Sequence, residues 1–207
     1  MPNKDIGKVD INRVVLRQLS VADVTNRYVA WLNDPEVNRY MTVRHFLPVT
    51  RDDVLKYIAN CEKNRLYHWG IFVDDIHAGN VTFFDRDDEN SSMDVSNIIG
   101  EPKYRGTNLS KIALTGAIDY ICSKKKLHRI EANVYSDNLP GITLLTNLGF
   151  KKEGVRREAA IIDNTYMDFL IFGLLSQEWF VRSSALPKVK VLPPSWDQAL
   201  VDNNVVS

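Results

Sequence analysis

The chain has 207 residues and carries 26 Lys and Arg against 26 Asp and Glu, so its formal net charge is zero; this argues against a nucleic-acid-binding protein, which usually has a basic excess. The length fits one domain with a sizeable core, and two cysteines are too few for a disulfide framework and indicate a reducing compartment. Residues 1–12 are polar, unlike a signal peptide, and the longest apolar stretch, 169–175, is far too short to cross a bilayer, so we expect a cytoplasmic protein without a membrane span.

The first half of the chain shows the patterns of a strand, several short helices and a hairpin. Ser20 and Thr50 are typical helix N-caps, and Pro35 suits the first turn of a helix. Asp74-Asp75 between two apolar runs indicates a hairpin turn. The expected elements are a strand over 14–19, helices over 20–31, 35–40 and 51–64, strands over 69–73 and 76–84, a polar loop over 85–92 and a strand over 93–99.

The second half alternates helical and strand patterns and ends in a segment of different composition. The expected elements are helices over 108–125 and 139–148 and strands over 128–134, 151–158 and 166–175. This order predicts an α/β protein, a mixed sheet with helices on both faces. We expect one domain over 1–182 and a Pro-containing tail over 183–207, which is wrapped on the surface, packed on a partner subunit or mobile.

The segment 98–110 has the layout of a phosphate cradle. An apolar strand runs into a polar turn with Arg105 and Gly106, and a long amphipathic helix follows. Backbone N–H groups at a helix start, together with the helix dipole, favour an anion there. The alternative is an ordinary turn between a strand and a helix.

A second helix begins about thirty residues later, in the segment Asn138 to Phe150, and closes with Gly149. The alternative is a helix without a ligand-binding role, with Asp137 or Asn138 as its N-cap. The two segments in this order resemble the acyl-CoA site of the GNAT N-acetyltransferases. Over roughly residues 12–179 the chain is similar to the ribosomal-protein-acetyltransferase branch of that family, which includes members that act in surface-polysaccharide amino-sugar synthesis.

The resemblance implies a mixed, mostly antiparallel central sheet, acetyl-CoA as co-substrate and a primary amine as the group acetylated. Asn108 and Ser110 stand where the family's cradle has small residues, and Leu145 stands where many relatives have a Tyr that protonates the leaving thiolate. A thiolate leaves readily, so water could replace that Tyr. The cofactor-binding residues implied by the resemblance are Asn97, Ile98, Ile99, Arg105, Gly106, Thr107, Asn108, Leu109, Ser110, Asn138 and Asn147.

Two carboxylates in apolar strand contexts, Asp94 and Glu131, are the candidates for the catalytic base. An amine attacks a thioester only as the neutral base, so a group in the site must take a proton from the ammonium. The resemblance places both carboxylates beside the acyl carbon. The alternative for each is an edge-exposed or ion-paired carboxylate, with Arg129 or Arg13 as partner.

The acceptor side is expected in the segment 28–45, where four polar residues are hard to assign to packing: Asn38, Arg39, Arg44 and His45. The preferred acceptor is a nucleotide-linked amino-sugar, since arginine and histidine would contact its phosphates. The alternatives are a protein N-terminal amine, and a non-catalytic domain that only binds acyl-CoA. A homodimer is a further expectation. The four histidines show no metal-ligand spacing, so we expect no metal.

Overall fold

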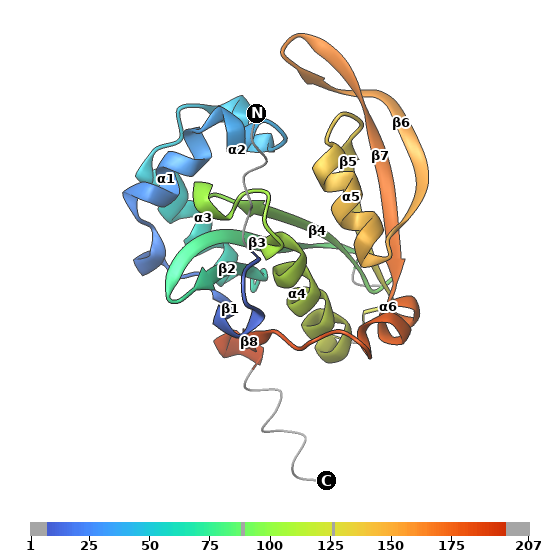
Figure 1. Cartoon of the computed structure of the whole chain (residues 1–207). Coiled ribbons are helices and arrows are strands. Elements are labelled where there is room, and N and C mark those ends of the chain that lie inside the picture. Colours follow the sequence, from blue (N-terminus) through green and yellow to red (C-terminus); the bar gives the residue numbers. More distant parts are fainter. Residues whose placement is uncertain (1–7, 88–89, 126, 198–207) are drawn as a thin grey trace.

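Eight strands form one sheet in a computed structural model that describes residues 8–87, 90–125 and 127–197 (Figure 1). The strand order is β6-β7-β5-β4-β3-β2-β1-β8. The pairs β4–β5 and β1–β8 are parallel and all others are antiparallel, so the expected mixed, mostly antiparallel sheet is confirmed. The strands are β1 (Val14–Gln18), β2 (His68–Val73), β3 (Ile76–Asp87), β4 (Ser92–Ile99), β5 (Arg129–Tyr135), β6 (Lys151–Ile162), β7 (Thr165–Leu175) and β8 (Lys190–Leu192).

Helices cover both faces of this sheet and enclose two apolar cores (Figure 1). Successive residues of a strand point to opposite faces. Ile71 therefore packs in the core under α4, whereas Phe72 packs in the core under α1 and α3. The helices are α1 (Asn26–Asn33), α2 (Pro35–Asn38), α3 (Arg51–Lys63), α4 (Leu109–Lys125), α5 (Leu139–Leu148) and α6 (Ser176–Ser183), with the 3-10 turns η1 (Ile11–Arg13), η2 (Val21–Asp23), η3 (Thr42–Phe46) and η4 (Pro102–Tyr104).

The expected helix over 20–31 is two elements in the structure. Ser20 caps the short turn η2 through a reciprocal capping box with Asp23. The hydroxyl of Thr25 then accepts a hydrogen bond from the N–H of Tyr28 at 3.2 Å and starts α1. Two capping side chains five residues apart thus divide one apolar stripe into two helices.

The hairpin β6–β7 is longer than the sequence pattern predicts. Its turn lies at Asp163 and Asn164, whose φ angles of 49° and 61° suit a two-residue turn of the type common in hairpins. A register shift between Arg156 and Ala160 interrupts the alternation, which explains why the pattern placed the end of β6 at residue 158. In the expected loop 85–92, residues 85–87 belong to β3, and residues 88–89 lie outside the described part.

The segment after α6 packs against the same chain as far as residue 197. β8 pairs in parallel with β1, with Leu16 opposite Val191. The buried carboxylate of Asp197 accepts hydrogen bonds from the hydroxyls of Tyr67 at 2.7 Å and Tyr120 at 2.8 Å. Of the three arrangements considered for the tail, the described part therefore has the one wrapped on the chain's own surface. Residues 198–207 lie outside the description.

Candidate active site

The parallel strands β4 and β5 separate soon after they begin, and the gap between them positions the site. Their pairing covers only Ser92–Asp94 against Arg129–Glu131. Beyond this point β4 stays paired with β3 as far as Ile99, and β5 stays paired with β7 as far as Tyr135. The sheet therefore splays, and the facing edges of β4 and β5 hold main-chain groups without a partner strand, which a ligand lying between the strands could bind.

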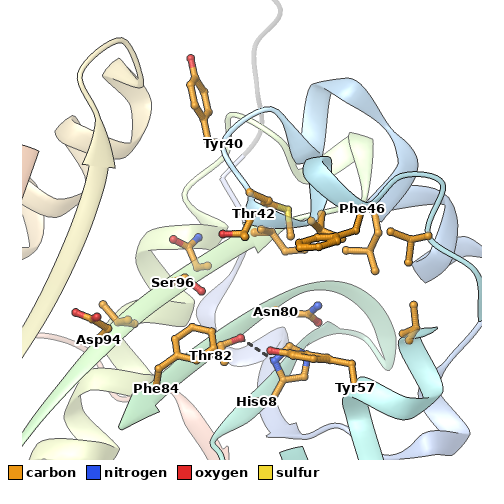
Figure 2. Close-up of a pocket in the computed structure, with 18 of the residues that line it drawn as sticks. Tyr40, Thr42, Phe46, Tyr57, His68, Asn80, Thr82, Phe84, Asp94 and Ser96 are labelled. Atoms are coloured by element: carbon orange, nitrogen blue, oxygen red, sulfur yellow. Dashed lines mark hydrogen bonds between the residues drawn. The ribbon is translucent and has the colours of Figure 1, made fainter. Parts of the chain in front are cut away.

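A cavity of about 840 Å³ lies next to this gap (Figure 2). Its walls are side chains of α1, η3 and α3 on one side and of β5 and β7 on the other, and its floor is the sheet. Phe46, 72% exposed, and Tyr57, 39% exposed, are lining residues that also reach solvent. The floor residues are His68, Asn80, Thr82, Phe84, Asp94 and Ser96.

The two candidate carboxylates lie on adjacent strands but in different surroundings. Asp94 and Glu131 are partners in the parallel register, at the point where the strands separate. Asp94 lines the cavity, and Glu131 is not among the lining residues. Glu131 accepts a hydrogen bond from Nε of Arg129 at 2.9 Å, and the same guanidinium pairs with Glu153 and lowers the pKa of that carboxyl. The ion-paired alternative thus describes Glu131, and Asp94 lines the cavity where an amine could sit.

The cradle segment brings several of its expected residues together at the start of α4. Gly106 adopts a φ of 75°, which glycine reaches without strain. The hydroxyl of Thr107 accepts a hydrogen bond from the N–H of Leu109 at 3.2 Å. The amide of Asn97, on β4, donates to the hydroxyl of Ser110 at 3.1 Å, so the gap and the helix start form one continuous polar surface.

The side chain of Arg105 points away from a phosphate site on the cradle. Its guanidinium donates to Asp34 at 2.8 Å, to Glu36 at 2.9 Å and to the carbonyl of Gly100 at 2.8 Å. These contacts tie the turn before α4 to the start of α2. A phosphate contact by this side chain would require it to leave two carboxylates, so the main chain of the turn is the better anion-binding group.

Asn108, which departs from the family pattern, binds the N-terminal segment of the chain. Its side-chain oxygen accepts from the N–H of Val9 at 2.7 Å, and its amide donates to the carbonyl of Val9 at 3.1 Å. A small residue at this position could not make either bond. The departure therefore has a structural explanation and leaves the main-chain cradle in place.

The helix α5 has the caps that the sequence predicts. Asn138 is the N-cap and accepts a hydrogen bond from the N–H of Gly141 at 3.1 Å, and Gly149 ends the helix with a φ of 97°. Leu145 is 5% exposed and belongs to the core. Asn147 is exposed, and its carbonyl accepts from Arg182 at 2.6 Å.

The four expected acceptor residues lie beside the cavity but are not among its lining residues. Asn38 is buried, and its amide donates to the carbonyl of Leu32 at 2.9 Å. Arg39 forms an ion pair with Asp137 at 3.3 Å. His45 is exposed. The position of Arg44 is considered below, because it connects the two sides of the cleft.

Sequence analysis missed most of the polar floor. His68 is buried, and burial lowers its pKa to about 3, so it is neutral. Its ring contacts the hydroxyls of Thr82 at 2.7 Å and Tyr28 at 3.2 Å. A signal was present for Asn80 and Thr82, which are polar residues two apart in the otherwise apolar stretch Ala78–Phe84 and must share one face. No comparable signal marks His68 or Tyr28.

The described part of the chain holds no cluster of metal-ligating side chains. No helix among the residues that the structure describes has the length and apolarity needed to cross a membrane.

Comparison with known proteins gives a consistent set of similarities. Residues 13–151 match the family model described as an acetyltransferase (GNAT) domain. An uncharacterized N-acetyltransferase p20 of Bacillus licheniformis is 29% identical over 171 residues, covering 81% of this chain and 95% of that protein. The [ribosomal protein uS5]-alanine N-acetyltransferase of Escherichia coli is 36% identical over 77 residues, or 37% of this chain and 40% of that protein.

Among solved structures, a chimera of the Vibrio cholerae spermidine N-acetyltransferase SpeG and hSSAT superposes with a TM-score of 0.72. It is 19% identical and covers 81% of this chain and 98% of its own. This similarity concerns the fold.

Proposed function

Because the chain belongs to the GNAT acetyltransferase family and is an acetyl-CoA-dependent N-acetyltransferase, we propose that its acceptor is the terminal amine of a peptide or protein. Acetyl-CoA is the donor that the family uses. The relatives matched over most of the chain are named as N-acetyltransferases, which favours an enzyme over a domain that only binds acyl-CoA.

The charge of the cavity carries this proposal. Among the described residues that line it, Asp53 and Asp94 are the charged side chains, and Lys and Arg are absent. A nucleotide-linked amino-sugar would bring its phosphates toward two carboxylates, which is unfavourable. A peptide amine arrives as an ammonium and suits an acidic cavity. The cavity therefore favours the peptide acceptor over the nucleotide-linked sugar.

Contacts of Arg44 bridge the two sides of the cleft and give a second reason for a peptide acceptor; these contacts are called the clasp. Arg44 lies in η3, and its guanidinium donates to the hydroxyl of Tyr135 at 2.8 Å and to the carbonyl of Ile161 at 2.6 Å. The rings of Tyr40 and Tyr135 approach to 5.5 Å across the same cleft. These contacts join the N-terminal helices to β5 and the β6–β7 hairpin, and a cleft bridged in this way suits a narrow chain end better than a bulky acceptor.

The names of similar proteins agree with an amine acceptor of this kind without deciding it. One relative acts on the alanine of ribosomal protein uS5, and a structural neighbour is a spermidine acetyltransferase. The uS5 enzyme matches only 37% of this chain, so its substrate is a guide to the class of acceptor.

The residues present fit acetyl-CoA. The splayed β4–β5 edges offer main-chain donors, and the turn at Gly106 exposes N–H groups before α4. When bound, acetyl-CoA supplies the acetyl thioester. Main-chain groups at Asn97 to Ile99 would polarise its carbonyl, as in an oxyanion hole. Asp94 would take the proton from the incoming ammonium, directly or through one water, so that the amine attacks in its neutral form.

A thiol-release assay with acetyl-CoA tests the acceptor. The panel contains peptides with a free N-terminal amine, the same peptides with a blocked terminus and one internal Lys, spermidine, and nucleotide-linked amino-sugars. We expect the free-terminus peptides to have the highest kcat/KM. A higher kcat/KM for any nucleotide-linked amino-sugar would overturn the peptide assignment and restore the amino-sugar expectation.

A further inference from the structure

The cavity has a carboxylate on one side and apolar side chains on the other. Asp94 lies where β4 and β5 separate, whereas Phe46 and Tyr57 lie above and below the opposite side (Figure 2). The lining side chains there come from α1, η3, α3 and the segment before α3. We call this group the apolar end, and its members are Leu32, Val43, Phe46, Val49, Val54 and Tyr57. Four of them belong to or pack against the core under α1 and α3, so the cavity opens one face of that core.

Exposed aromatic rings continue the apolar surface toward the carboxylate. Phe46, Tyr57 and Phe84 all line the cavity and all reach solvent. Phe84 is the partner of Asp94 in the β3–β4 register, so its ring begins beside the carboxylate. Apolar surface gains free energy when a ligand removes it from water, and exposed apolar groups gathered in a concave site mark a binding surface. The walls of the cavity therefore favour an apolar ligand group.

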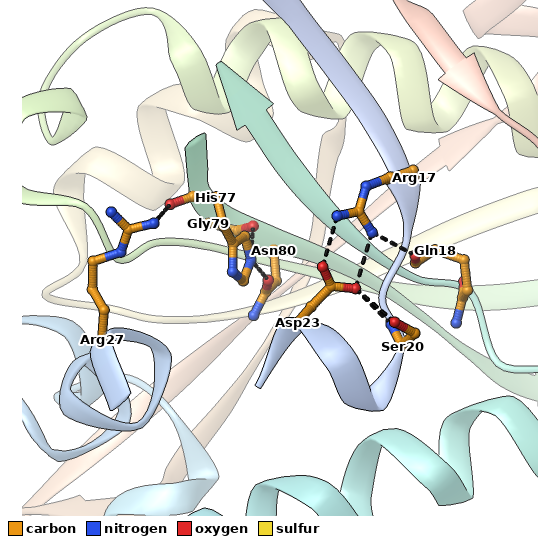
Figure 3. Close-up of polar contacts among 8 residues, drawn as sticks. All are labelled: Arg17, Gln18, Ser20, Asp23, Arg27, His77, Gly79 and Asn80. Carbon is orange, nitrogen blue, oxygen red and sulfur yellow. Dashed lines mark hydrogen bonds and ion pairs between the residues drawn. The ribbon is translucent and has the colours of Figure 1, made fainter. Parts of the chain in front are cut away.

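The polar side chains of the floor already have partners within the protein. The two ring nitrogens of His68 contact the hydroxyls of Thr82 at 2.7 Å and Tyr28 at 3.2 Å. The side-chain oxygen of Asn80 lies 2.8 Å from Nε2 of His77 (Figure 3). Buried polar groups need hydrogen-bond partners, and these contacts provide them without a ligand. A ligand group that passes over this floor therefore does not have to be polar.

The distance between the two sides determines the size of that group. The ring of Tyr57 meets the ring of His68 edge-on, with 5.2 Å between centroids, so it stands over β2. β2 lies two strand spacings, about 10 Å, from β4, which carries Asp94. A straight side chain of four carbons spans about 5 Å beyond its Cα, and van der Waals contact adds about 4 Å. An amine held at Asp94 thus brings the end of such a side chain to Tyr57, which a single methyl group does not reach.

We propose that the apolar end binds the substituent on the carbon that carries the reacting amine, and that the enzyme selects acceptors in which this substituent is apolar and about four carbons long. For a peptide acceptor, which rests on the proposed function, the substituent is the side chain of the first residue. Asp94 then holds the ammonium, and the rings of Phe84, Phe46 and Tyr57 contact the side chain. A short first residue leaves these rings in water, and a polar one loses its own hydration against them.

Four peptides that differ only in the first residue test this selection. Norleucine has an unbranched side chain of four carbons, alanine has one carbon, and glutamine and arginine are long but polar. Each methylene removed from water is worth about fourfold in kcat/KM. We therefore expect kcat/KM for the norleucine peptide to exceed that for the alanine peptide at least about tenfold, and the glutamine peptide to be no better than the alanine peptide.

The arginine peptide tests the carboxylate beside the apolar end. Asp53 lines the cavity, but its Oδ2 accepts from the N–H of Thr50 at 2.9 Å and from the hydroxyl of Thr50 at 2.6 Å and so caps α3. We expect the arginine peptide to have a lower kcat/KM than the norleucine peptide. A higher kcat/KM for the arginine or the glutamine peptide than for the norleucine peptide would overturn the inference.

Small amines repeat the test without a peptide. Pentylamine, ethylamine and 4-aminobutanamide carry the substituents of norleucine, alanine and glutamine on the carbon next to the amine. We expect the same order, with pentylamine the best acceptor of the three, because the apolar end contacts the substituent itself.

Two matched pairs of variants locate the effect. Phe46→Ala and Tyr57→Ala should each lower the norleucine to alanine ratio of kcat/KM by about threefold or more, since each removes part of the apolar contact. Phe180→Ala on α6 and Tyr166→Ala on β7 are the controls, because these rings are 45% and 64% exposed outside the cavity, and they should keep the wild-type ratio. Acetyl-CoA affinity and thermal unfolding check that each variant is folded.

The outcomes separate the two proposals. Equal kcat/KM for the norleucine and alanine peptides overturns the inference and leaves the peptide acceptor standing. A norleucine preference that persists in both Phe46→Ala and Tyr57→Ala also overturns the inference, because another surface then binds the side chain. A pentylamine preference that falls in these variants, without turnover of any peptide, supports the inference and overturns the peptide acceptor. Absence of turnover with every amine tested overturns both.

Discussion

The proposed acetyl-CoA side and the proposed acceptor side of this enzyme are built in different ways. The cradle over residues 98–110 is contiguous and offers mainly backbone groups, and its departures from the family pattern serve other contacts, such as the bond between Asn108 and Val9. The acceptor cavity takes side chains from strands, helices and a 3-10 turn far apart in the chain. A main-chain site tolerates many side-chain changes, whereas a side-chain site changes with each one. We expect single substitutions to act mostly on the acceptor side.

The largest effect is expected at Asp94, where the two sides meet. Asp94→Asn should lower kcat by about 10²–10⁴ because the ammonium loses its proton acceptor. Acetyl-CoA affinity should stay unchanged, since this contact belongs to the acceptor. Glu131→Gln is the matched control and should cost far less, because Glu131 already pairs with Arg129. Steady-state kinetics and calorimetry measure both, and a larger loss for Glu131→Gln would assign the base to that residue.

The floor of the acceptor cavity should also make stability depend on pH, which the cradle should not. The pKa of His68 is about 3 in the folded protein and 6.5 when unfolded. As pH falls below 6.5 only the unfolded chain binds the proton, so the free energy of unfolding falls, by about 2 kcal/mol at pH 5 for this one group.

Urea unfolding at pH 7.5 and pH 5 measures this loss. His68→Gln should lose about 2 kcal/mol less between the two pH values than the wild type. Burial also lowers the pKa of His77, so some pH dependence of the same sign should remain in the variant. An unchanged difference between the two pH values would mean that His68 is not enclosed in the folded protein.

Arg105→Ala tests whether the cradle binds through its main chain. The variant loses contacts with Asp34, Glu36 and the carbonyl of Gly100. We expect the free energy of unfolding to fall by about 1–2 kcal/mol and acetyl-CoA affinity to change less than about threefold. Arg13→Ala, which breaks an exposed ion pair with Asp74, is the control for a surface charge. A phosphate contact by Arg105 would instead weaken acetyl-CoA binding by about 1.5–3 kcal/mol with little change in stability.

The smallest effect is expected from opening the clasp with Arg44→Ala. The loss of its bonds to Tyr135 and Ile161 should lower kcat/KM for a free-terminus peptide by about three- to tenfold, because the cleft becomes less ordered. Acetyl-CoA affinity should not change. Arg44→Lys keeps the charge but cannot form both bonds, so it should resemble alanine. If Arg44 instead binds a phosphate, Arg44→Lys should retain activity, and Arg44→Ala should raise the KM only for nucleotide-linked acceptors.

The sequence by itself predicted the parts that depend on neighbouring residues. Caps at Thr50 and Asn138 and the αL end at Gly149 predicted α3 and α5 with bounds close to those observed. The strand, turn and helix over 98–110 also follow from local chemistry, because a glycine turn before a helix needs no distant partner. The resemblance to the GNAT family added the mixed, mostly antiparallel sheet and the acetyl donor.

Only the tertiary structure decided where the functional side chains point. Asp94 and Glu131 look alike in sequence, but only Glu131 has Arg129 at hydrogen-bond distance. Arg39 and Arg44 have the chemistry of phosphate ligands, yet carboxylate, hydroxyl and carbonyl partners more than ninety residues away engage both. His68 lies on the floor of the cavity because the register of β2 and β3 places it opposite Thr82. Such long-range pairing depends on how the whole sheet closes, and no local pattern of residues encodes it.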